Sequence, residues 1–299
     1  MQEKKTYHSG FIAIVGRPNV GKSTLLNALL GEKIAIVSNR PQTTRNRILG
    51  VCTQPDSQIV FLDTPGIHTP RTRLGEYMMQ TVQDALQGID GLLVVVDVTS
   101  VTKQDRDLVT EMSNRKIKKT LVLNKIDQIP KEQLLALILS LSKDPYDEIV
   151  PISALTGDGV DELKQTLIAM LPEGPQYFPE DTLTDQPERF LCGEMIREKA
   201  LYHLKDEVPH GIGVEVMSLK KIGDGLTEID ATIYCERPAH KAIIIGKQGS
   251  MLKQIGMEAR IDIEALLDTH INLKLWVKVK EGWRNRREDL RTLGYTRQE

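Results

Sequence analysis

Cysteine is scarce in this 299-residue chain, and its scarcity excludes two kinds of stabilising site. Cys52, Cys192 and Cys235 are far apart in sequence and odd in number. They cannot form a complete disulfide framework, and they contain no C-x-x-C pair that could hold zinc. The histidines, scattered from His8 to His270, also lack metal-ligand spacing. We therefore expect a chain that folds without disulfides or zinc in a reducing compartment.

Long apolar segments are also absent, and charge of one sign does not dominate. No stretch approaches the roughly 20 apolar residues of a membrane span, and the N-terminal residues lack the apolar core of a signal peptide. We expect a cytoplasmic protein. The net charge is -2, with 39 Lys and Arg against 41 Asp and Glu, so the whole chain does not indicate nucleic-acid binding. One local exception is the segment from Lys274 to Arg297, where eight residues are basic and three are acidic.

The first part of the chain alternates short apolar runs with helical patterns. The whole chain of 299 residues exceeds the roughly 100 to 200 residues of a typical domain, so two domains are expected. Predicted strands lie at 11–15, 59–62, 92–96, 121–123 and 149–152, and predicted helices at 22–30, 74–86, 105–115, 131–141 and 160–171. This alternation predicts an α/β domain with a doubly wound, mostly parallel sheet.

The alternation ends at Pro172, where a proline-rich stretch begins. Its composition predicts a semi-rigid linker over residues 173–188. Beyond it, the pattern predicts a helix at 189–204, strands at 213–221 and 227–235 joined by a turn at Gly223-Asp224-Gly225, helices around Gly246, and a strand at 271–280. We therefore predict a nucleotide-binding domain over residues 1–172 and an α+β domain over residues 189–299.

A phosphate-binding loop follows the first predicted strand. Residues 16–23 match G-x-x-x-x-G-K-[ST] between a strand and a helix, which is the context this motif requires and which argues against a chance glycine loop. Loop N–H groups can converge on phosphate oxygens, Lys22 can reach the β- and γ-phosphates, and Ser23 can ligate Mg²⁺. The predicted nucleotide contacts here are Gly16, Arg17, Pro18, Asn19, Val20, Gly21, Lys22, Ser23 and Thr24.

A second motif follows the strand at 59–62. It reads Asp63-Thr64-Pro65-Gly66. The carboxylate can hold a water bound to Mg²⁺, and the N–H of Gly66 can reach the γ-phosphate. Alone this string would be a turn, but downstream of a phosphate loop it predicts the γ-phosphate sensor.

Two later loops concern the base. In Asn124-Lys125-Ile126-Asp127, the Asp127 carboxylate can accept hydrogen bonds from N1–H and the 2-amino group of guanine. Adenine would leave this charged acceptor unpaired, at a cost of roughly 1.5 to 3 kcal/mol per bond, so GTP is expected rather than ATP. Ser153-Ala154-Leu155 follows another strand, and one of its N–H groups could contact the guanine oxygen.

In this order and spacing, the four motifs resemble the Ras-like GTPases of translation. The resemblance implies that a threonine between Ser23 and Asp63 closes on Mg²⁺ in the GTP state. Thr44 matches the placement in bacterial relatives, and Thr43 is the alternative. The expected catalytic residues are Lys22, Thr44, Asp63 and Gly66.

One departure from the Ras-like pattern concerns hydrolysis. Ile67 occupies the position after Gly66, where Ras-like proteins place a water-orienting glutamine. The resemblance is then to GTPases that rely on a potassium ion held by an asparagine of the phosphate loop, here Asn19, and slow intrinsic hydrolysis is expected. A loop-capping role for Asn19 is the alternative.

The second domain contains a G-x-x-G loop, Gly246-Lys247-Gln248-Gly249, between two helical segments. The order helix, two strands, helix, loop, helix, strand resembles a type II KH domain, whose loop clamps about four nucleotides of single-stranded RNA. Arg237, His240, Lys241 and Lys253 lie near the loop in sequence. A small α/β interaction module with solvated charges is the alternative. The predicted RNA contacts are Gly246, Lys247, Gln248, Gly249, Arg237, Lys241 and Lys253.

Together, the GTPase motifs and the KH pattern resemble the Era family of bacterial ribosome-assembly GTPases over nearly the whole chain. The resemblance includes Tyr177-Phe178-Pro179 and the ending around Trp276, Trp283 and Tyr295. It implies GTP and GDP as ligands, binding near the 3′ end of small-subunit ribosomal RNA, a role in small-subunit assembly, and peripheral attachment to the inner face of the membrane. Alternative functions are an RNA chaperone with little GTP turnover and a membrane-associated regulator. Nothing in the sequence indicates an oligomer.

Overall fold

The computed structural model describes residues 6–40, 42–223 and 225–295, and the chain forms two units. The first unit extends to Asp185, without the segments 36–43 and 69–78. Those two segments group with residues from Gln186 onward in the second unit. Arg297 and Asp224, which the sequence placed in a basic segment and a turn, lie outside the described residues. No helix of the described chain is long and apolar enough to cross a membrane.

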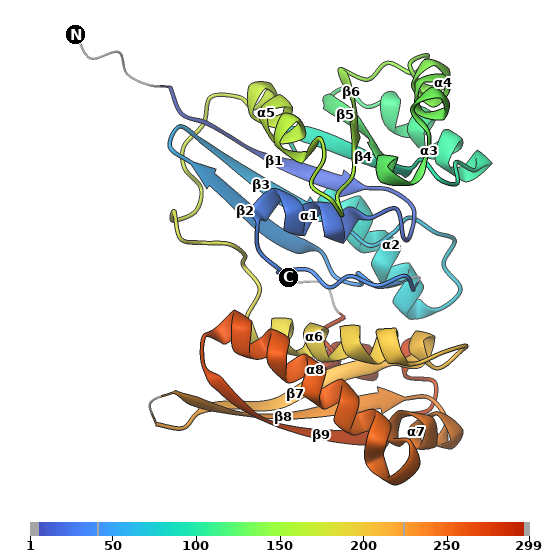
Figure 1. The fold of residues 1–299 in the computed structure, drawn as a ribbon, viewed down its shortest axis with the longest axis vertical. Helices are drawn as coiled ribbons and strands as arrows, with labels where there is room; N and C mark the ends of the chain where they lie inside the picture. Colours follow the sequence, from blue (N-terminus) through green and yellow to red (C-terminus); the bar gives the residue numbers. More distant parts are fainter. Residues whose placement is uncertain (1–5, 41, 224, 296–299) are drawn as a thin grey trace. The chain divides into compact units, whose positions relative to one another are not determined.

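The first unit is built on a six-stranded sheet with strand order β2-β3-β1-β4-β5-β6 (Figure 1). Only β2 is antiparallel to its neighbour, β3, and the other pairs are parallel. The strands are β1 (His8–Val15), β2 (Ile48–Gln54), β3 (Ser57–Asp63), β4 (Gly91–Asp97), β5 (Lys118–Asn124) and β6 (Glu148–Ile152). The helices are α1 (Lys22–Leu30), α2 (Arg73–Ala85, of which residues 79–85 belong to this unit), α3 (Lys103–Ser113), α4 (Lys131–Leu141) and α5 (Val160–Met170). This is the doubly wound, mostly parallel architecture that the sequence predicts.

Alternate residues of the strands build two cores, one on each face of the sheet. Ile12 and Ile14 of β1 pack with α1 and α5, which lie together on one side of the sheet in Figure 1. Ala13 and Val15 face the other core with α2, α3 and α4. Because the central strands are buried on both faces, they read as continuous apolar runs in sequence. This burial holds the carboxyl ends of β1, β3 and β5 at one edge, where the predicted motifs begin.

The strand β2 is absent from the sequence-based prediction. It includes Gly50, a residue type that does not favour strands, and it lies at the edge of the sheet. A Cβ on Gly50 would come within 2.8 Å of Leu30 and 2.9 Å of Leu26, so the glycine allows α1 to pack closely against this strand. Close packing of α1 therefore explains the glycine at position 50, which makes this strand difficult to predict from the sequence.

The proline-rich stretch after α5 is hydrogen-bonded to the first unit. Gly174 N–H donates to the carbonyl of Tyr7 at 3.0 Å. The buried side chain of Gln58 accepts from the N–H groups of Tyr177 (2.9 Å) and Phe178 (3.0 Å) and donates to the carbonyl of Phe178 (2.9 Å). The prolines are visible in the sequence, but the hydrogen bonds from this stretch to the distant Gln58 are not. Residues 174–178 therefore form part of the nucleotide-binding unit.

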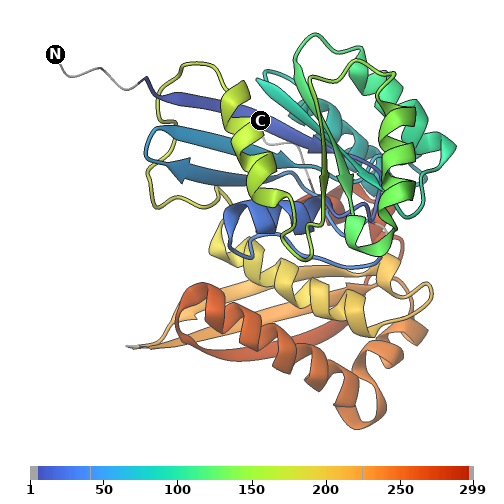
Figure 2. The same cartoon turned by 45° about the horizontal axis from the view of Figure 1, so that its top comes forward.

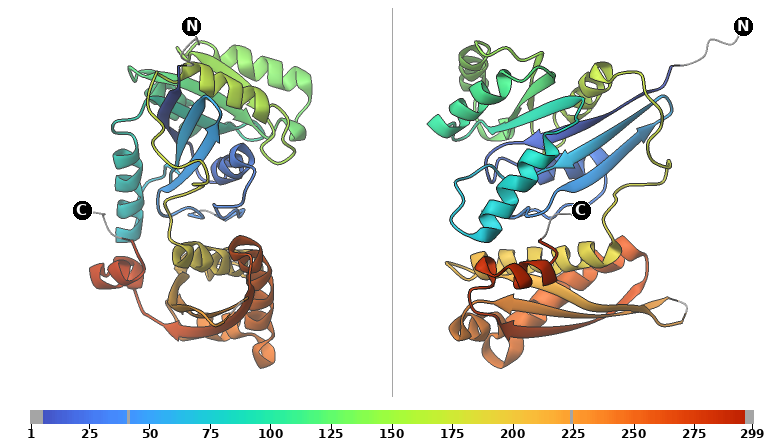
Figure 3. Two further views of the ribbon diagram at one scale, coloured as in Figure 1. Left: turned by 90° about the vertical axis from the view of Figure 1, so that its left-hand side faces the viewer. Right: turned by 180° about the vertical axis from the view of Figure 1, so that it is seen from behind.

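The second unit contains a three-stranded sheet with order β7-β8-β9. The strand β7 is antiparallel to β8, and β8 is parallel to β9. Its elements are α6 (Glu188–His203), β7 (Gly213–Lys221), β8 (Leu226–Cys235), α7 (Pro238–Ile245), α8 (Ser250–Leu267), β9 (His270–Val279) and α9 (Arg287–Thr292). Figure 2 shows α6 and α8 side by side, and Figure 3 shows them on one face of the curved sheet. Their apolar sides and the inward residues of the strands form one core.

The chain after β9 folds back onto this unit. The indole of Trp283 is fully buried and donates to the carbonyl of Gly211 at 2.9 Å. Its ring stacks on Tyr295 with 6.0 Å between ring centroids. Residues 283–295 are therefore part of the packed domain.

Candidate nucleotide and nucleic-acid sites

The predicted phosphate loop connects β1 directly to α1. A Cβ on Gly21 would come within 2.3 Å of the Asn124 side-chain nitrogen, and a Cβ on Gly16 within 2.5 Å of the Val95 carbonyl. Both positions therefore need glycine, because the loop closely approaches strands β4 and β5. Asn19 has a φ of 65°, in the left-handed region that asparagine tolerates better than most residues. The loop thus has the tight backbone that a phosphate-binding site requires.

Lys22 lies inside this loop. Its side chain is buried, and Nζ donates to the carbonyls of Gly16 (3.2 Å) and Arg17 (3.0 Å). Burial lowers the pKa of Lys22 to about 8, although the nearby Asp63 carboxylate opposes the change. The amine therefore lies over the loop, close to where phosphate oxygens would converge.

The Arg17 side chain faces away from the loop interior. Its Nη1 donates to Thr102 Oγ1 at 2.5 Å and to Asp105 Oδ2 at 2.6 Å. Thr102 and Asp105 also form the capping box that begins α3. The predicted nucleotide contact of Arg17 is thereby limited to its backbone, because its guanidinium ties the loop to α3.

Three oxygen-bearing side chains meet beside the loop. Ser23 Oγ lies 2.7 Å from Asp63 Oδ2 and 2.7 Å from Thr44 Oγ1. Thr44 Oγ1 lies 3.5 Å from the same carboxylate oxygen. The structure therefore brings Thr44 to this cluster. Thr43 instead donates to the carbonyl of Arg40 at 2.6 Å.

The chemistry of this cluster suits a hard divalent cation. All its donors are oxygens, and Mg²⁺ prefers such ligands together with water and phosphate. The second carboxylate oxygen of Asp63, Oδ1, is buried with no hydrogen-bond partner in the described part of the chain. Burial raises the pKa of Asp63 to about 6, against the effects of Lys22, Ser23 and Thr44. A cation with its bound water would satisfy the free oxygen and favour the charged carboxylate.

The segment after Asp63 lies against the phosphate loop. A Cβ on Gly66 would come within 2.6 Å of the Pro18 nitrogen, so only glycine fits there without a backbone shift. Ile67 N–H donates to the carbonyl of Gly16 at 3.0 Å, and its side chain packs against an apolar core. Thr64 Oγ1 donates to the Ile14 carbonyl at 2.7 Å, while Pro65 is buried. This packing leaves Gly66 beside the loop, and Ile67 offers no polar side-chain atom there.

Asn124 joins three loops of the predicted base site. Its Nδ2 donates to the Val20 carbonyl at 2.8 Å. Its Oδ1 accepts from the N–H groups of Lys125 (2.8 Å) and Ala154 (2.9 Å). One amide therefore holds the phosphate loop and both base loops together.

Lys125 and Asp127 lie on the same loop with different exposures. Lys125 Nζ donates to the carbonyl of Asn19 (3.0 Å) and to Asp97 Oδ2 (2.5 Å). Asp127 is in a short 3-10 turn, and its side chain is exposed, as a group that meets a ligand must be. Asp97 belongs to none of the predicted motifs, and its signal is its place at the end of β4, in register with Asn124.

The third base loop is more constrained than the sequence suggests. Ser153 is buried and its Oγ accepts from the N–H of Thr156 at 3.2 Å. Leu155 is 77% exposed and could cover one face of a bound base. Because the Ala154 N–H already donates to Asn124, a contact from it to a guanine oxygen would have to be shared.

In the second unit, the G-x-x-G loop separates α7 from α8. Gly246, Gln248 and Gly249 have φ values of 73°, 52° and 80°. A Cβ on Gly246 would lie 2.7 Å from the Met251 Cβ, so this glycine is needed for the tight turn. Lys247 and Gln248 are both exposed. The loop therefore presents two polar side chains at the start of α8.

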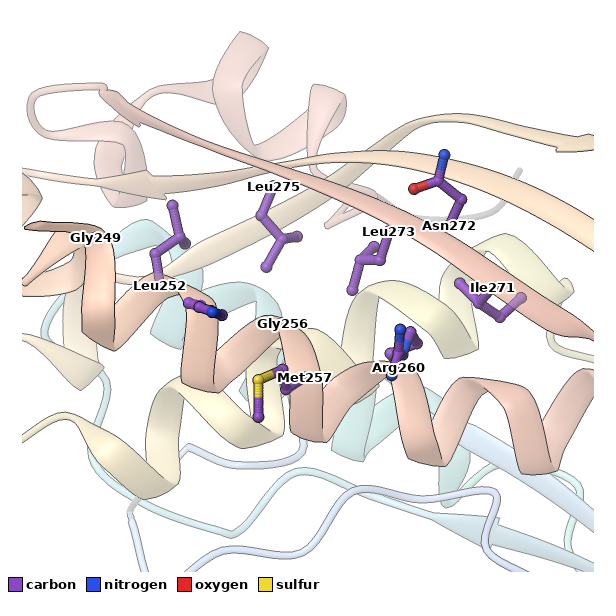
Figure 4. Close-up of a pocket in the computed structure, with 10 residues that line it drawn as sticks. Gly249, Leu252, Gly256, Met257, Arg260, Ile271, Asn272, Leu273 and Leu275 are labelled. Carbon is purple, nitrogen blue, oxygen red and sulfur yellow. The ribbon is translucent and has the colours of Figure 1, made fainter.

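A groove of about 400 Å³ adjoins this loop between α8 and β9 (Figure 4). Leu252, Leu273 and Leu275 give it an apolar floor, and Lys253 and Arg260 supply positive charge. The absence of a side chain at Gly256 keeps the floor open. Of this lining, only Gly249 and Lys253 are RNA contacts predicted from the sequence, because the other residues meet through the packing of a helix on a strand. Arg237 and Lys241 lie at α7 and do not line the groove.

The basic C-terminal segment is less available for binding than its composition suggests. Lys280 pairs with Asp289 at 3.0 Å, and Arg284 pairs with Glu236 at 2.5 Å. Lys274 pairs with Glu228. Three of the basic residues are therefore paired with acidic ones, and two of those acids, Glu236 and Glu228, are distant in sequence.

The site geometry defines a class of protein: a Ras-like GTPase domain followed by a type II KH domain. A model of "50S ribosome-binding GTPase" matches residues 11–125, and a KH-domain model matches residues 207–284. GTPase Era of Ruminiclostridium cellulolyticum is 54% identical over 292 residues, covering 97% of this chain and 98% of the relative. GTPase Era of Clostridioides difficile is 50% identical over 293 residues, covering 97% and 99%.

Solved structures agree with these relatives. Era in complex with MgGDPNP and nucleotides 1506–1542 of 16S ribosomal RNA has a TM-score of 0.93 and 42% identity, covering 97% of this chain and 99% of that one. A variant of Aquifex aeolicus Era bound to GDP·AlF4⁻ has a TM-score of 0.92 and 42% identity, covering 96% and 99%. The chain belongs to the Era family of GTPases.

Proposed function

We propose that this GTPase uses GTP binding and hydrolysis to control binding of the 3′ region of small-subunit ribosomal RNA, and so assists assembly of the small subunit. The observation that carries this proposal is the presence, in one chain, of the Ser23–Asp63 cluster and the G-x-x-G groove. An Era structure with MgGDPNP and 16S ribosomal RNA, alike in fold over nearly the whole chain, supports it. Co-purification of the tagged protein with small subunits, compared in GTP and GDP, is the direct test.

The nucleotide would be held by residues of the first unit. Gly16 to Thr24 would surround the phosphates, and Lys22 would compensate their charge. Mg²⁺ would be bound by Ser23 and Thr44, with Asp63 holding a coordinated water. The exposed carboxylate of Asp127 would select guanine, with Asn124 and Lys125 supporting the loop and residues 153–155 closing over the base. Mg²⁺ supplies charge neutralisation at the phosphates, and this oxygen cluster suits it.

Hydrolysis is proposed to depend on K⁺ at Asn19. The support is that Ile67 cannot orient water and that Asn19 has a defined left-handed conformation within the loop. Phosphate release should be faster in potassium than in sodium at equal ionic strength. Asn19→Ala should remove that difference while sparing GDP binding. Equal wild-type rates in the two salts would disprove the role of potassium without affecting the nucleotide site.

RNA binding is proposed to use the loop and the adjoining groove. The exposed Lys247 and Gln248 would approach the backbone, and the apolar floor between α8 and β9 would receive bases. Replacing both loop residues with aspartate should weaken single-stranded RNA binding and flatten its salt dependence, because the new charges repel phosphate. A matched control is Lys220→Asp with Lys221→Asp, on exposed positions of β7.

The same assay separates two outcomes. Loss of RNA binding only in the loop variant, with unchanged GTP affinity and thermal stability, supports the loop as the contact. Normal RNA binding in the loop variant would show that the loop is not the RNA contact, and the basic residues from Lys274 onward would become the candidate.

Domain extents and location complete the proposal. The nucleotide-binding domain is proposed to cover residues 1–172 and the KH domain 189–299, with residues 173–188 as a connection whose first part, residues 174–178, is hydrogen-bonded to the nucleotide-binding unit. Likeness to the Era family supports a cytoplasmic protein with a peripheral fraction on the inner membrane face. Fractionation in low and high salt tests this location, since an electrostatically held fraction is released by salt.

A further inference from the structure

Hydrolysis needs a polar group that the residue after Gly66 does not supply. Ile67 donates its backbone N–H to the carbonyl of Gly16 at 3.0 Å, and its side chain packs against the core. The next residue, His68, is half-buried and belongs to the same unit as the nucleotide motifs. It is thus the first polar side chain after the γ-phosphate motif.

The His68 ring turns back toward that motif. Its Nδ1 lies 2.8 Å from the carbonyl oxygen of Gly66. Gly66 in turn lies against Pro18 of the phosphate loop, closely enough that a Cβ would be 2.6 Å from the Pro18 nitrogen. The imidazole is therefore hydrogen-bonded to Gly66, the residue whose N–H is expected to contact the γ-phosphate.

The hydrogen bond to Gly66 determines the roles of the two ring nitrogens. A carbonyl oxygen can only accept, so Nδ1 must carry the proton of this bond. In the neutral ring, Nε2 is then an acceptor. That nitrogen is buried with no hydrogen-bond partner in the described part of the chain. Buried acceptors are nearly always paired, so an unpaired one beside a functional motif requires an explanation.

We propose that His68 is a catalytic residue of GTP hydrolysis, and that its Nε2 accepts a hydrogen bond from the attacking water. The bond from Nδ1 to Gly66 fixes the tautomer and directs the ring. The water oxygen forms a bond to the γ-phosphorus while the bond from that phosphorus to the bridging oxygen breaks. The electron pair leaves on GDP, and the water proton ends on the released phosphate. The role rests on the proposed nucleotide site.

Three substitutions of His68 separate chemistry from packing. His68→Ala removes the ring, His68→Phe keeps an aromatic ring without nitrogen, and His68→Gln restores a side-chain oxygen that can accept. The control is His8→Ala, since His8 also has Nδ1 near a backbone carbonyl, that of Leu171 at 3.3 Å, but lies at the start of β1. Each full-length variant is measured for single-turnover hydrolysis of GTP, for affinity toward GDP and GDPNP, and for thermal unfolding.

The expected result is a fall in the hydrolysis rate of about 100-fold for the Ala and Phe variants, within the usual range for a lost acid–base or water-positioning group. His68→Gln should retain clearly more activity, the control should match wild type, and nucleotide affinities should not change. Recovery by Phe would show a packing role and overturn the proposal, as would wild-type hydrolysis by His68→Ala. Loss of nucleotide affinity in all three variants would instead place His68 in binding. If instead the proposed nucleotide site is wrong, Lys22→Ala and Ser23→Ala will bind and turn over nucleotide normally, which is a separate observation from the effect of the His68 variants.

Discussion

Filling the groove beside the G-x-x-G loop should weaken RNA binding without removing any charge. Gly256 lies on α8, and an ideal Cβ there would be 3.2 Å from Leu275 Cδ1. Gly256→Leu would therefore project a branched side chain over the apolar floor of a groove of about 400 Å³. A base lost from such a surface costs about 1 to 3 kcal/mol. We expect a loss of about 2 kcal/mol, or about 30-fold in Kd.

Two features make this substitution informative. Replacing a mid-helix glycine improves helix propensity by up to about 1 kcal/mol, which opposes the cost of the 3.2 Å contact with Leu275, and thermal unfolding shows whether the helix stays folded. Because no phosphate contact is lost, the slope of log Kd against log salt should stay at the wild-type value, whereas Lys253→Ala should reduce it by about 1.

Fluorescence anisotropy with a single-stranded RNA matching the 3′ end of small-subunit ribosomal RNA, measured at several salt concentrations, provides both quantities. Ala265→Leu, on an exposed position of the same helix, is the matched control. Wild-type affinity in Gly256→Leu, with an intact fold, would show that bases do not occupy this groove.

The remaining predictions concern the nucleotide site. Asp127→Asn should weaken GTP binding and improve binding of xanthosine triphosphate, because the amide can donate to the extra oxygen of xanthine; titration of both nucleotides decides, and equal losses would refute the assignment. Since burial raises the pKa of Asp63 to about 6, Mg²⁺-dependent GTP binding should weaken as pH falls through about 6, when the carboxylate becomes protonated. Magnesium titrations between about pH 5 and 8 test this, and constant magnesium dependence across that range would contradict it.

The motifs of the nucleotide site could be predicted because each is local in sequence. A phosphate loop is a short pattern at a strand–helix junction, and apolar runs such as Ile59 to Leu62 identify the strands that precede the other motifs. The order of these elements was enough to predict the sheet and, with the G-x-x-G loop, the second domain. Local patterns therefore identified the class of fold and most candidate residues.

Features that depend on distant residues could not be predicted in this way. The groove requires α8 to pack on β9, and the proline-rich stretch is held by Gln58, more than a hundred residues earlier. The direction of the Arg17 side chain depends on the cap of α3. The neutralisation of Arg284 by Glu236 is equally invisible in a local charge count.

The amide of Asn124 has a consequence for how the nucleotide site opens. Its bonds to Val20, Lys125 and Ala154 join loops that follow β1, β5 and β6. If any one loop breaks its hydrogen bond to this amide, a buried donor or acceptor is left unpaired. The three loops should therefore open together as one cooperative local unit. In native-state hydrogen exchange, the amides of Lys125 and Ala154 should then exchange with similar opening free energies. A nucleotide would leave through a single opening event that frees its phosphates and its base at once.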